Sequence, residues 1–156
     1  MSSTPALCAL AGLGIEVTLH PYAYDPKAEA TGLQAAEALG IDPAVMLKTL
    51  MVEIDGKPAC CVIPSDRQLS MKRVATAFGG KSAAMMPAPK AEKLTGYHVG
   101  GISPFGQKRA VPTAIEGTAC TAARVWINAG QRGLLLSLTP EAALRALSAQ
   151  ALPLIA

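Results

Sequence analysis

The sequence predicts an α+β domain in which helices surround a mixed, strongly curved β-sheet. Two observations support this fold class: short strands are joined by hairpin signals, and helical segments are inserted between them. The chain has 156 residues, the usual size of one domain, and shows no linker or repeat, so we expect a single domain over residues 1–156. Because 51% of the residues are apolar and only 4% aromatic, aliphatic side chains and methionine must fill the core.

The first half of the chain alternates helices with strands. Thr4 can cap a helix that has Pro5 at its first position. Asp55-Gly56 is a strong hairpin signal between two apolar runs, and Pro64 stops the second run. The expected elements, in order, are a helix from Pro5 to a stop at 12–14, a strand at 15–19, a helix at 31–39, and strands at 46–54 and 59–63.

The second half continues this alternation. Ser70 can cap a helix that ends at the glycine pair 79–80, and Thr139 with Pro140 opens a closing helix. The other expected elements are a strand near Met85, a short helix at 89–94, and strands at 110–115, 124–128 and 134–138.

Composition argues against a membrane segment, a metal site and a disulfide framework. Residues 1–5 contain no basic n-region and no long apolar run follows them, so we expect neither a signal peptide nor a transmembrane helix, and a cytoplasmic location. The four cysteines show no C-x-x-C spacing and only two histidines accompany them, so we expect no metal. Cys60 and Cys61 would point to opposite faces of one strand. We expect most of the thiols to be buried and inert.

Charge is unevenly distributed along the chain. Residues 1–71 contain four Lys or Arg against eight Asp or Glu, whereas residues 72–132 contain nine against two. A basic face would attract a polyanion through counterion release, although solvated lysines also serve solubility. The nine cations are Lys72, Arg73, Lys81, Lys90, Lys93, Lys108, Arg109, Arg124 and Arg132.

Lys48 is chemically unusual because it interrupts the apolar run 45–52. A cation buried without a partner has a large desolvation cost, so Lys48 either extends to water or faces a polar site. At the mouth of a pocket it could hold a phosphate or polarise a carbonyl.

The run Gly-Gly-Ile-Ser-Pro-Phe-Gly-Gln-Lys-Arg at residues 100–109 has the features of a binding loop. Glycine lets a backbone approach a ligand closely, Pro104 restricts Ser103 to extended geometry, and the two cations that follow could hold a phosphate. Clusters of glycine and proline also mark ordinary turns, so a turn without a ligand remains the alternative.

Taken together, spaced motifs resemble the YbaK/EbsC family. The motifs are Tyr22 with Asp25-Pro26, Lys48-Thr49-Leu50, the run 96–109 that contains Gly-Gly-Ile-Ser-Pro, and Gly130-Gln131-Arg132-Gly133. They occur in the family's order over nearly the whole chain. The resemblance implies the barrel-like fold of the editing domain inserted in bacterial prolyl-tRNA synthetases, and the activity of a trans-editing aminoacyl-tRNA deacylase that needs no metal or organic cofactor.

The same resemblance implies roles for individual residues. Lys48 matches the family's essential lysine, and Gly101 with Pro104 matches its Gly-x-x-P loop, so Lys48 and Gly101 are the expected catalytic residues. The expected substrate is aminoacyl-tRNA, first of all cysteinyl-tRNA carrying the proline tRNA, with prolyl-tRNA synthetase as a candidate partner. The residues expected to bind it are Tyr22, Thr31, Thr49, Ile102, Ser103, Pro104, Asn128 and Arg132.

No Ser-His-Asp arrangement is evident, since Ser103 precedes a proline and neither it nor His98 has an obvious acidic partner. In the YbaK branch the thiol of the substrate cysteine is thought to attack its own ester, and well-oriented intramolecular attack reaches effective molarities of roughly 10⁵ to 10⁸ M. Thr31, Asn128 and Leu135 depart from the cysteine-specific pattern. Deacylation of another small amino acid such as alanine, serine or threonine therefore stays open, as does a non-catalytic module that binds tRNA or a synthetase.

Overall fold

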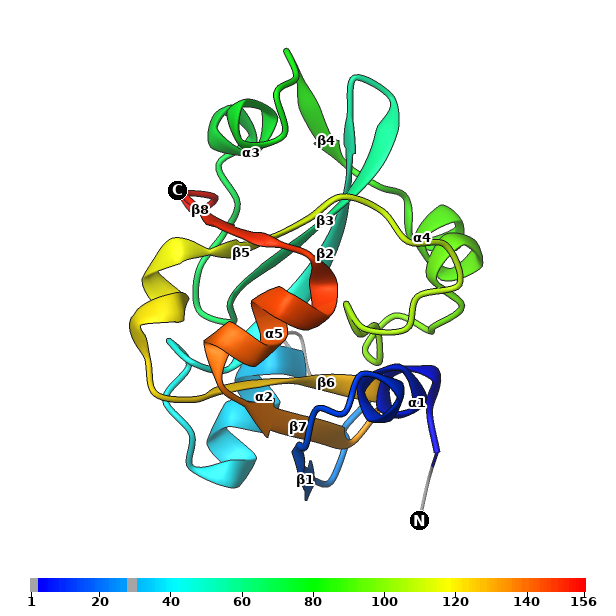
Figure 1. Ribbon diagram of the computed structural model, residues 1–156, viewed down its shortest axis with the longest axis vertical. Coiled ribbons are helices and arrows are strands. Elements are labelled where there is room, and N and C mark those ends of the chain that lie inside the picture. The colour runs from blue at the N-terminus through cyan, green and yellow to red at the C-terminus, as the bar shows by residue number, and fades with distance from the viewer. Residues whose placement is uncertain (1–2, 28–30) are drawn as a thin grey trace.

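The computed structural model describes the backbone of residues 3–27 and 31–156, and the side chains of residues 3–27 and 33–156 (Figure 1). Its helices are α1 (Pro5–Gly12), α2 (Thr31–Leu39), α3 (Met71–Ala77), α4 (Ala88–Thr95) and α5 (Pro140–Leu147), together with the 3₁₀ helix η1 (Gly117–Thr121). Its strands are β1 (Thr18–Pro21), β2 (Leu47–Ile54), β3 (Lys57–Pro64), β4 (Ala83–Met85), β5 (Thr113–Glu116), β6 (Val125–Gln131), β7 (Leu134–Leu138) and β8 (Gln150–Leu152). This order of elements confirms the α+β class.

The strands form two sheets. One is the antiparallel three-stranded sheet β1-β7-β6, and the other is the five-stranded sheet β4-β2-β3-β5-β8, which is mixed because β3–β5 and β5–β8 are parallel pairs. An isolated parallel bridge between Met46 and Trp126 links the two. In Figure 1 the β2–β3 hairpin rises at one end of the molecule beside α3 and β4, and the three-stranded sheet lies at the other end. The expected barrel-like sheet is not confirmed, since the described strands form no closed barrel.

The expected caps are present. The hydroxyl of Thr4 accepts a hydrogen bond from the amide of Leu7 and opens α1, and Ser70 and Thr139 cap α3 and α5 in the same way. At the tip of the β2–β3 hairpin, Asp55 and Gly56 both have positive φ, as a two-residue turn with the twist of the flanking strands requires.

Three expectations on strand positions need correction. The strand expected at 110–115 begins only at Thr113. The strand expected at 15–19 begins only at Thr18, because the amide of Ile15 donates to the carbonyl of Leu10 and so belongs to the end of α1. The short strand β8 was not expected. It is an exposed edge strand of Gln150–Leu152 that forms only through distant parallel pairing with β5, which no local pattern encodes.

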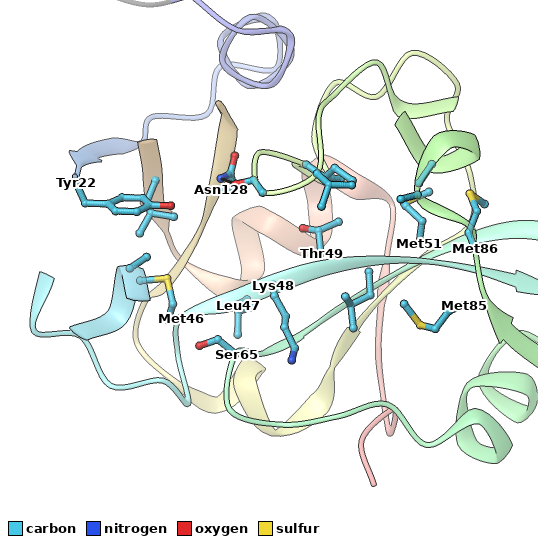
Figure 2. A pocket seen from close by; sticks show the side chains of 18 residues that line it. Tyr22, Met46, Leu47, Lys48, Thr49, Met51, Ser65, Met85, Met86 and Asn128 are labelled. Atoms are coloured by element: carbon cyan, nitrogen blue, oxygen red, sulfur yellow. Dashed lines mark hydrogen bonds between the residues drawn. The ribbon is translucent and has the colours of Figure 1, made fainter. Parts of the chain in front are cut away.

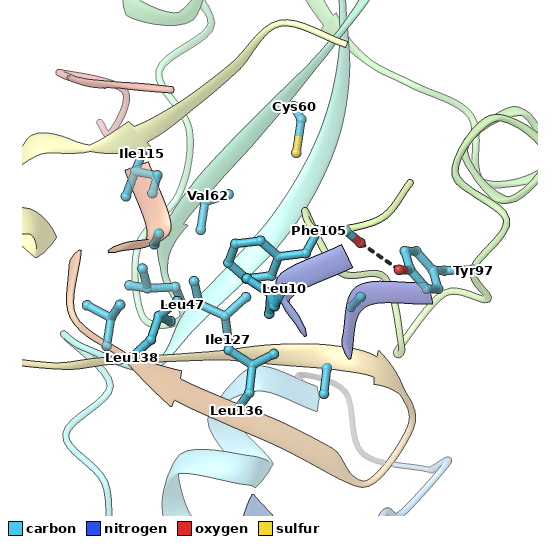
Figure 3. Close-up of a cluster of buried hydrophobic side chains, with 14 of the residues drawn as sticks. Leu10, Leu47, Cys60, Val62, Tyr97, Phe105, Ile115, Ile127, Leu136 and Leu138 are labelled. Carbon is cyan, nitrogen blue, oxygen red and sulfur yellow. Dashed lines mark hydrogen bonds between the residues drawn. The ribbon is translucent and has the colours of Figure 1, made fainter. Parts of the chain in front are cut away.

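The central strand β3 is buried on both faces and separates two hydrophobic clusters. Cys60 packs with Val62, Ile115 and Ile127 in the larger cluster (Figure 3), whereas Cys61 packs with a second cluster on the other face. Burial raises the pKa of both thiols to about 12. The expected opposite orientation is confirmed, and both side chains are protonated at neutral pH.

A buried carboxylate attaches the C-terminal segment. Glu116, only 2% exposed, accepts hydrogen bonds from the backbone amides of Leu154 (2.8 Å), Thr118 (2.9 Å) and Ile155 (3.2 Å). Burial alone would raise the pKa of this carboxyl, but the three amides stabilise the charged form more, so its pKa lies below the ordinary value.

No helix within residues 3–27 and 31–156 is long and apolar enough to cross a membrane.

Candidate functional site

A cavity of about 430 Å³ opens along one edge of β2 (Figure 2). Strand β4 pairs with β2 from Val52 to Ile54, and the amide of Met86 donates to the carbonyl of Met51 at 3.1 Å, so within the described chain no strand pairs with residues 47–50 on this edge. Tyr22, α2, α4, the loop at 99–102 and Asn128 form the other walls. The cavity therefore exposes a stretch of strand edge to a ligand.

Lys48 and Thr49 reach the cavity from opposite sides of β2, because consecutive side chains of a strand alternate. In Figure 2 the ammonium of Lys48 is directed toward the side of Ser65, and Thr49 points toward the side of Asn128. The cavity reaches around the strand edge and offers a cation on one side and a hydroxyl on the other.

The ammonium of Lys48 is available for a ligand. Its side chain is partly buried, and within the described chain it forms no hydrogen bond or salt bridge. Burial lowers its pKa, and the negative charge of Asp66 partly opposes this effect. Lys48 therefore lines the cavity as the polar-site interpretation of the sequence requires.

The hydroxyl of Thr49 is buried and finds no hydrogen-bond partner among the described residues. An unpaired buried hydroxyl costs about 1–3 kcal/mol, which a bound ligand could recover by donating or accepting a hydrogen bond. Thr49 is thus the polar side chain of the cavity best placed to contact a ligand on this side of β2.

Tyr22 also lines the cavity, and Figure 2 shows its ring directed inward. Burial raises the pKa of its phenol, while the nearby backbone of Gly133 acts in the opposite direction. The phenol is therefore neutral at physiological pH and can donate a hydrogen bond.

The glycine loop contributes Gly100 and Ile102 to the cavity, but Gly101 lies buried behind them. A Cβ atom on Gly101 would come within 2.9 Å of the amide nitrogen of Arg132 and 3.1 Å of the carbonyl carbon of Gln131. The sequence suggested that glycine here makes room for a ligand. The close approach that requires glycine is to the protein's own backbone.

Ser103 and Pro104 are buried and do not line the cavity. The hydroxyl of Ser103 accepts from the amide of Phe105 at 3.2 Å, and its carbonyl accepts from the side chain of Gln107 at 3.1 Å. Pro104 borders a second, smaller cavity beside α1. These two residues shape the loop from behind.

Asn128 and Arg132 lie close to the cavity, but their polar atoms are already engaged. Asn128 lines the cavity, and its carboxamide bonds to backbone groups at 100, 130 and 131. Arg132 does not line the cavity and donates from two nitrogens to the carbonyl of Val99. The side chain of Thr31, also expected at the site, lies outside the described residues.

Sequence reasoning missed a methionine-rich part of the wall. Methionines from the start of β2, its centre and the β4 region meet there, although nothing in the local pattern distinguishes them from core residues. They are Met46, Met51, Met85 and Met86. Thioether side chains adapt to irregular ligands, and Met85 is 49% exposed.

The nine cations of residues 72–132 do not form one free face. Lys90 pairs with Glu53 at 2.6 Å, Arg124 bonds to Ser137, and Arg132 holds Val99. Exposed cations whose side chains make no hydrogen bond to another described residue are Lys72, Lys81, Lys93, Lys108 and Arg109.

In the part of the chain that the structure describes, no group of three or more His, Cys, Asp or Glu side chains could hold a metal ion.

Comparison with known proteins identifies the family to which this fold and cavity belong. Residues 26–146 match the family described as the aminoacyl-tRNA editing domain. The chain belongs to this aminoacyl-tRNA editing family. EbsC of Enterococcus faecalis, by its name a candidate Cys-tRNA(Pro)/Cys-tRNA(Cys) deacylase, is 39% identical over 111 residues, which cover 70% of this chain and 67% of EbsC. The resemblance to the YbaK/EbsC family is confirmed.

Two further similarities support this editing-domain assignment. The proline–tRNA ligase of Maridesulfovibrio salexigens is 29% identical over 75 residues, or 48% of this chain and 13% of the ligase. The crystal structure of a candidate trans-editing enzyme for prolyl-tRNA synthetase superposes with a TM-score of 0.86 at 21% identity, covering 100% of this chain and 99% of that chain. At this identity the superposition establishes the fold alone. Family membership confirms the expectation of an aminoacyl-tRNA editing enzyme.

Proposed function

We propose that the protein is a trans-editing deacylase that cleaves the ester between a small amino acid and the terminal ribose of tRNA, in the cavity along β2. The observation that carries this proposal is that Lys48 and Thr49 both line the cavity at the edge of β2, and that neither polar group has a partner among the described residues. Family membership supports the reaction class, and these two side chains support the choice of the cavity along β2 as its site.

Lys48 supplies the positive charge that ester cleavage requires. Attack on the ester carbonyl places negative charge on its oxygen, and the adjacent nucleotide carries a phosphate. A cation in a partly buried site stabilises either charge more strongly than it would in water. Thr49 and the phenol of Tyr22 lie across the strand edge from Lys48, where they can orient the aminoacyl group.

The nucleophile in this proposal does not come from the cavity wall. The hydroxyl of Ser65 bonds to the carbonyl of Pro43 at 3.4 Å, and neither cysteine of β3 lines the cavity. For a cysteinyl ester, the thiol of the substrate attacks its own carbonyl carbon, the bond to the ribose oxygen breaks, and that oxygen takes up the thiol proton. The products are a cyclic thioester and free tRNA. For other esters, water attacks in its place.

Cysteine on proline tRNA is the substrate we propose first, because the EbsC relative carries that activity in its name and part of a proline–tRNA ligase is similar to this chain. The cavity favours a small, weakly polar side chain, since Ala35, Leu135 and Met46 form its wall beside Tyr22. Serine or threonine is one alternative, because the hydroxyl of Thr49 can serve a substrate hydroxyl as well as a thiol, and alanine is another, because the apolar wall accepts a methyl group.

The test is ester loss from proline tRNA charged separately with cysteine, alanine, serine and proline, each compared with a blank without protein. Rapid loss of the cysteinyl ester alone supports the proposal and its thiol step. Preference for alanine or serine keeps the deacylase and changes the substrate. Tight tRNA binding without loss of any ester, with or without prolyl-tRNA synthetase, would establish a non-catalytic binding module in its place.

A further inference from the structure

The irregular end of β6 and the turn that joins it to β7, residues 128–133 and called the β6–β7 turn below, hold two walls of the cavity at once. On one side, the amide of Tyr22 donates to the carbonyl of Gly133 at 2.9 Å. On the other side, the turn reaches the glycine loop at 99–101 through Asn128 and Arg132. Because both walls attach to one turn, its geometry sets the distance between them.

Arg132 holds the loop by two hydrogen bonds to one carbonyl. Its Nε and Nη2 atoms both donate to the carbonyl of Val99, at 3.0 and 2.8 Å, and its guanidinium lies 5.5 Å from the ring centre of Tyr24. The amide of Val99 donates to the carboxylate of Glu92 at 2.8 Å. Both backbone groups of Val99 are therefore held by side chains.

Asn128 forms a hydrogen bond to the next carbonyl along the loop. Its Nδ2 donates to the carbonyl of Gly100 at 3.3 Å, and its Oδ1 accepts from the amides of Gly130 at 2.6 Å and Gln131 at 3.1 Å. These bonds use both acceptor positions of Oδ1 and one of the two N–H donors of Nδ2, so the carboxamide is held mainly by the protein's own backbone.

Close packing completes the attachment. Gly101 lies so near the backbone of residues 131 and 132 that no Cβ fits, and a Cβ on Gly100 would come within 3.0 Å of the phenol oxygen of Tyr24. The residue that follows, Ile102, lines the cavity. The loop therefore has one position relative to the turn.

We infer that Asn128 and Arg132 are positioning residues, which fix the loop at 99–102 against the β6–β7 turn and do not contact the substrate themselves. The inference rests on the proposed function and revises the substrate-binding role expected for both residues. It has a consequence for selectivity. A residue that fixes a loop common to all substrates changes the rate for every amino acid alike, whereas a residue that reads the amino acid changes the ratios.

The first test replaces Asn128→Asp, which keeps an acceptor for the amides of Gly130 and Gln131 but places a carboxylate oxygen against the carbonyl of Gly100. A displacement of about 1 Å costs roughly 100-fold in rate, so we expect kcat to fall about 10- to 100-fold for every ester, with unchanged ratios between them. Gln131→Ala, at an exposed neighbour in the same turn, is the control and retains the wild-type rate. A changed ratio would overturn the inference for Asn128.

The second test compares Arg132→Gln with Arg145→Gln, the same charge loss at an exposed position on α5. A phosphate contact would appear as a shallower dependence of log kcat/KM on log salt, by about 0.7 to 0.9 per contact. We expect Arg132→Gln to lower kcat for all esters while the salt slope stays equal to that of the control. A shallower slope would assign Arg132 to the tRNA and overturn the inference.

Amide hydrogen exchange of the peptide at 97–104, measured on the free protein, tests the attachment of the loop to the β6–β7 turn independently of catalysis. We expect both variants to exchange faster there than wild type and the two controls to exchange as wild type does. Asn128→Ser and Arg132→Lys serve if either variant fails to fold. If wild type hydrolyses no ester, the proposed function fails, and hydrogen exchange alone tests whether Asn128 and Arg132 fix the loop. Unchanged exchange in both variants overturns the inference.

Discussion

Gly101→Ala should damage the site from behind the cavity wall. The added Cβ would lie 2.9 Å from the amide nitrogen of Arg132 and 3.1 Å from the carbonyl carbon of Gln131. Ordinary contacts begin near 3.4 Å, so the loop must retreat by about 0.5 Å, and it meets backbone that cannot rotate away. Overpacking of this kind costs about 1–3 kcal/mol of unfolding free energy. The same retreat displaces Gly100 and Ile102, and we expect kcat/KM to fall about 10- to 100-fold.

Gly12→Ala is the matched control, because a Cβ at Gly12 meets nothing within 4 Å and the residue lies in the last turn of α1. We expect that variant to gain about 0.4–1 kcal/mol and to keep full activity. Deacylation kinetics and urea unfolding of both variants measure the two effects. Wild-type activity and stability in Gly101→Ala would refute the close approach on which the site description depends.

Three further outcomes follow from buried polar groups. Thr49→Val removes an unpaired hydroxyl while keeping its shape, so we expect unfolding free energy to stay equal or rise by about 1 kcal/mol while kcat/KM falls; a loss of stability would mean that the hydroxyl has a partner. Glu116→Gln should cost about 1–3 kcal/mol at pH 7. Because folding lowers the pKa of Glu116, its contribution to stability is present above the unfolded pKa of about 4.3 and is lost as pH falls through the lower folded pKa. The difference in unfolding free energy between wild type and variant, measured by urea titration, should therefore shrink in acid. A pH-independent difference would contradict this. Iodoacetamide should label exposed Cys8 in the native protein but leave Cys60 and Cys61 unmodified until urea unfolds it, as intact mass would show; native labelling of either β3 thiol would contradict their burial.

Much of the fold could be predicted because its signals are local. Thr4 with Pro5 begins α1, Asp55-Gly56 turns the β2–β3 hairpin, and Ser70 begins α3. Each depends on bonds within a few residues of the signal. By contrast, β8 exists only through pairing with β5, and the division of the strands into two sheets depends on distant contacts. Such information is not present in any short window of sequence.

The site was predicted unevenly for a similar reason. Lys48, Thr49 and Tyr22 line one cavity, because β2 and the segment after β1 carry them there, and their roles stay predictions. For Asn128 and Arg132 the sequence predicts contact with the substrate, whereas the structure shows their bonds to the glycine loop. Their carboxamide and guanidinium bond to carbonyls about thirty residues away, and no spacing rule predicts such partners.

Ester loss from the preferred aminoacyl-tRNA in the Lys48→Ala variant tests the central claim most directly, with Lys57→Ala, an exposed lysine at the start of β3, as the matched control. Removing one preorganised charge from a partly buried site costs about 100- to 1,000-fold in kcat. We expect that loss for Lys48→Ala and wild-type kinetics for Lys57→Ala, with both proteins folded. Equal hydrolysis by wild type and Lys48→Ala would show that the cavity along β2 is not where the ester is cleaved.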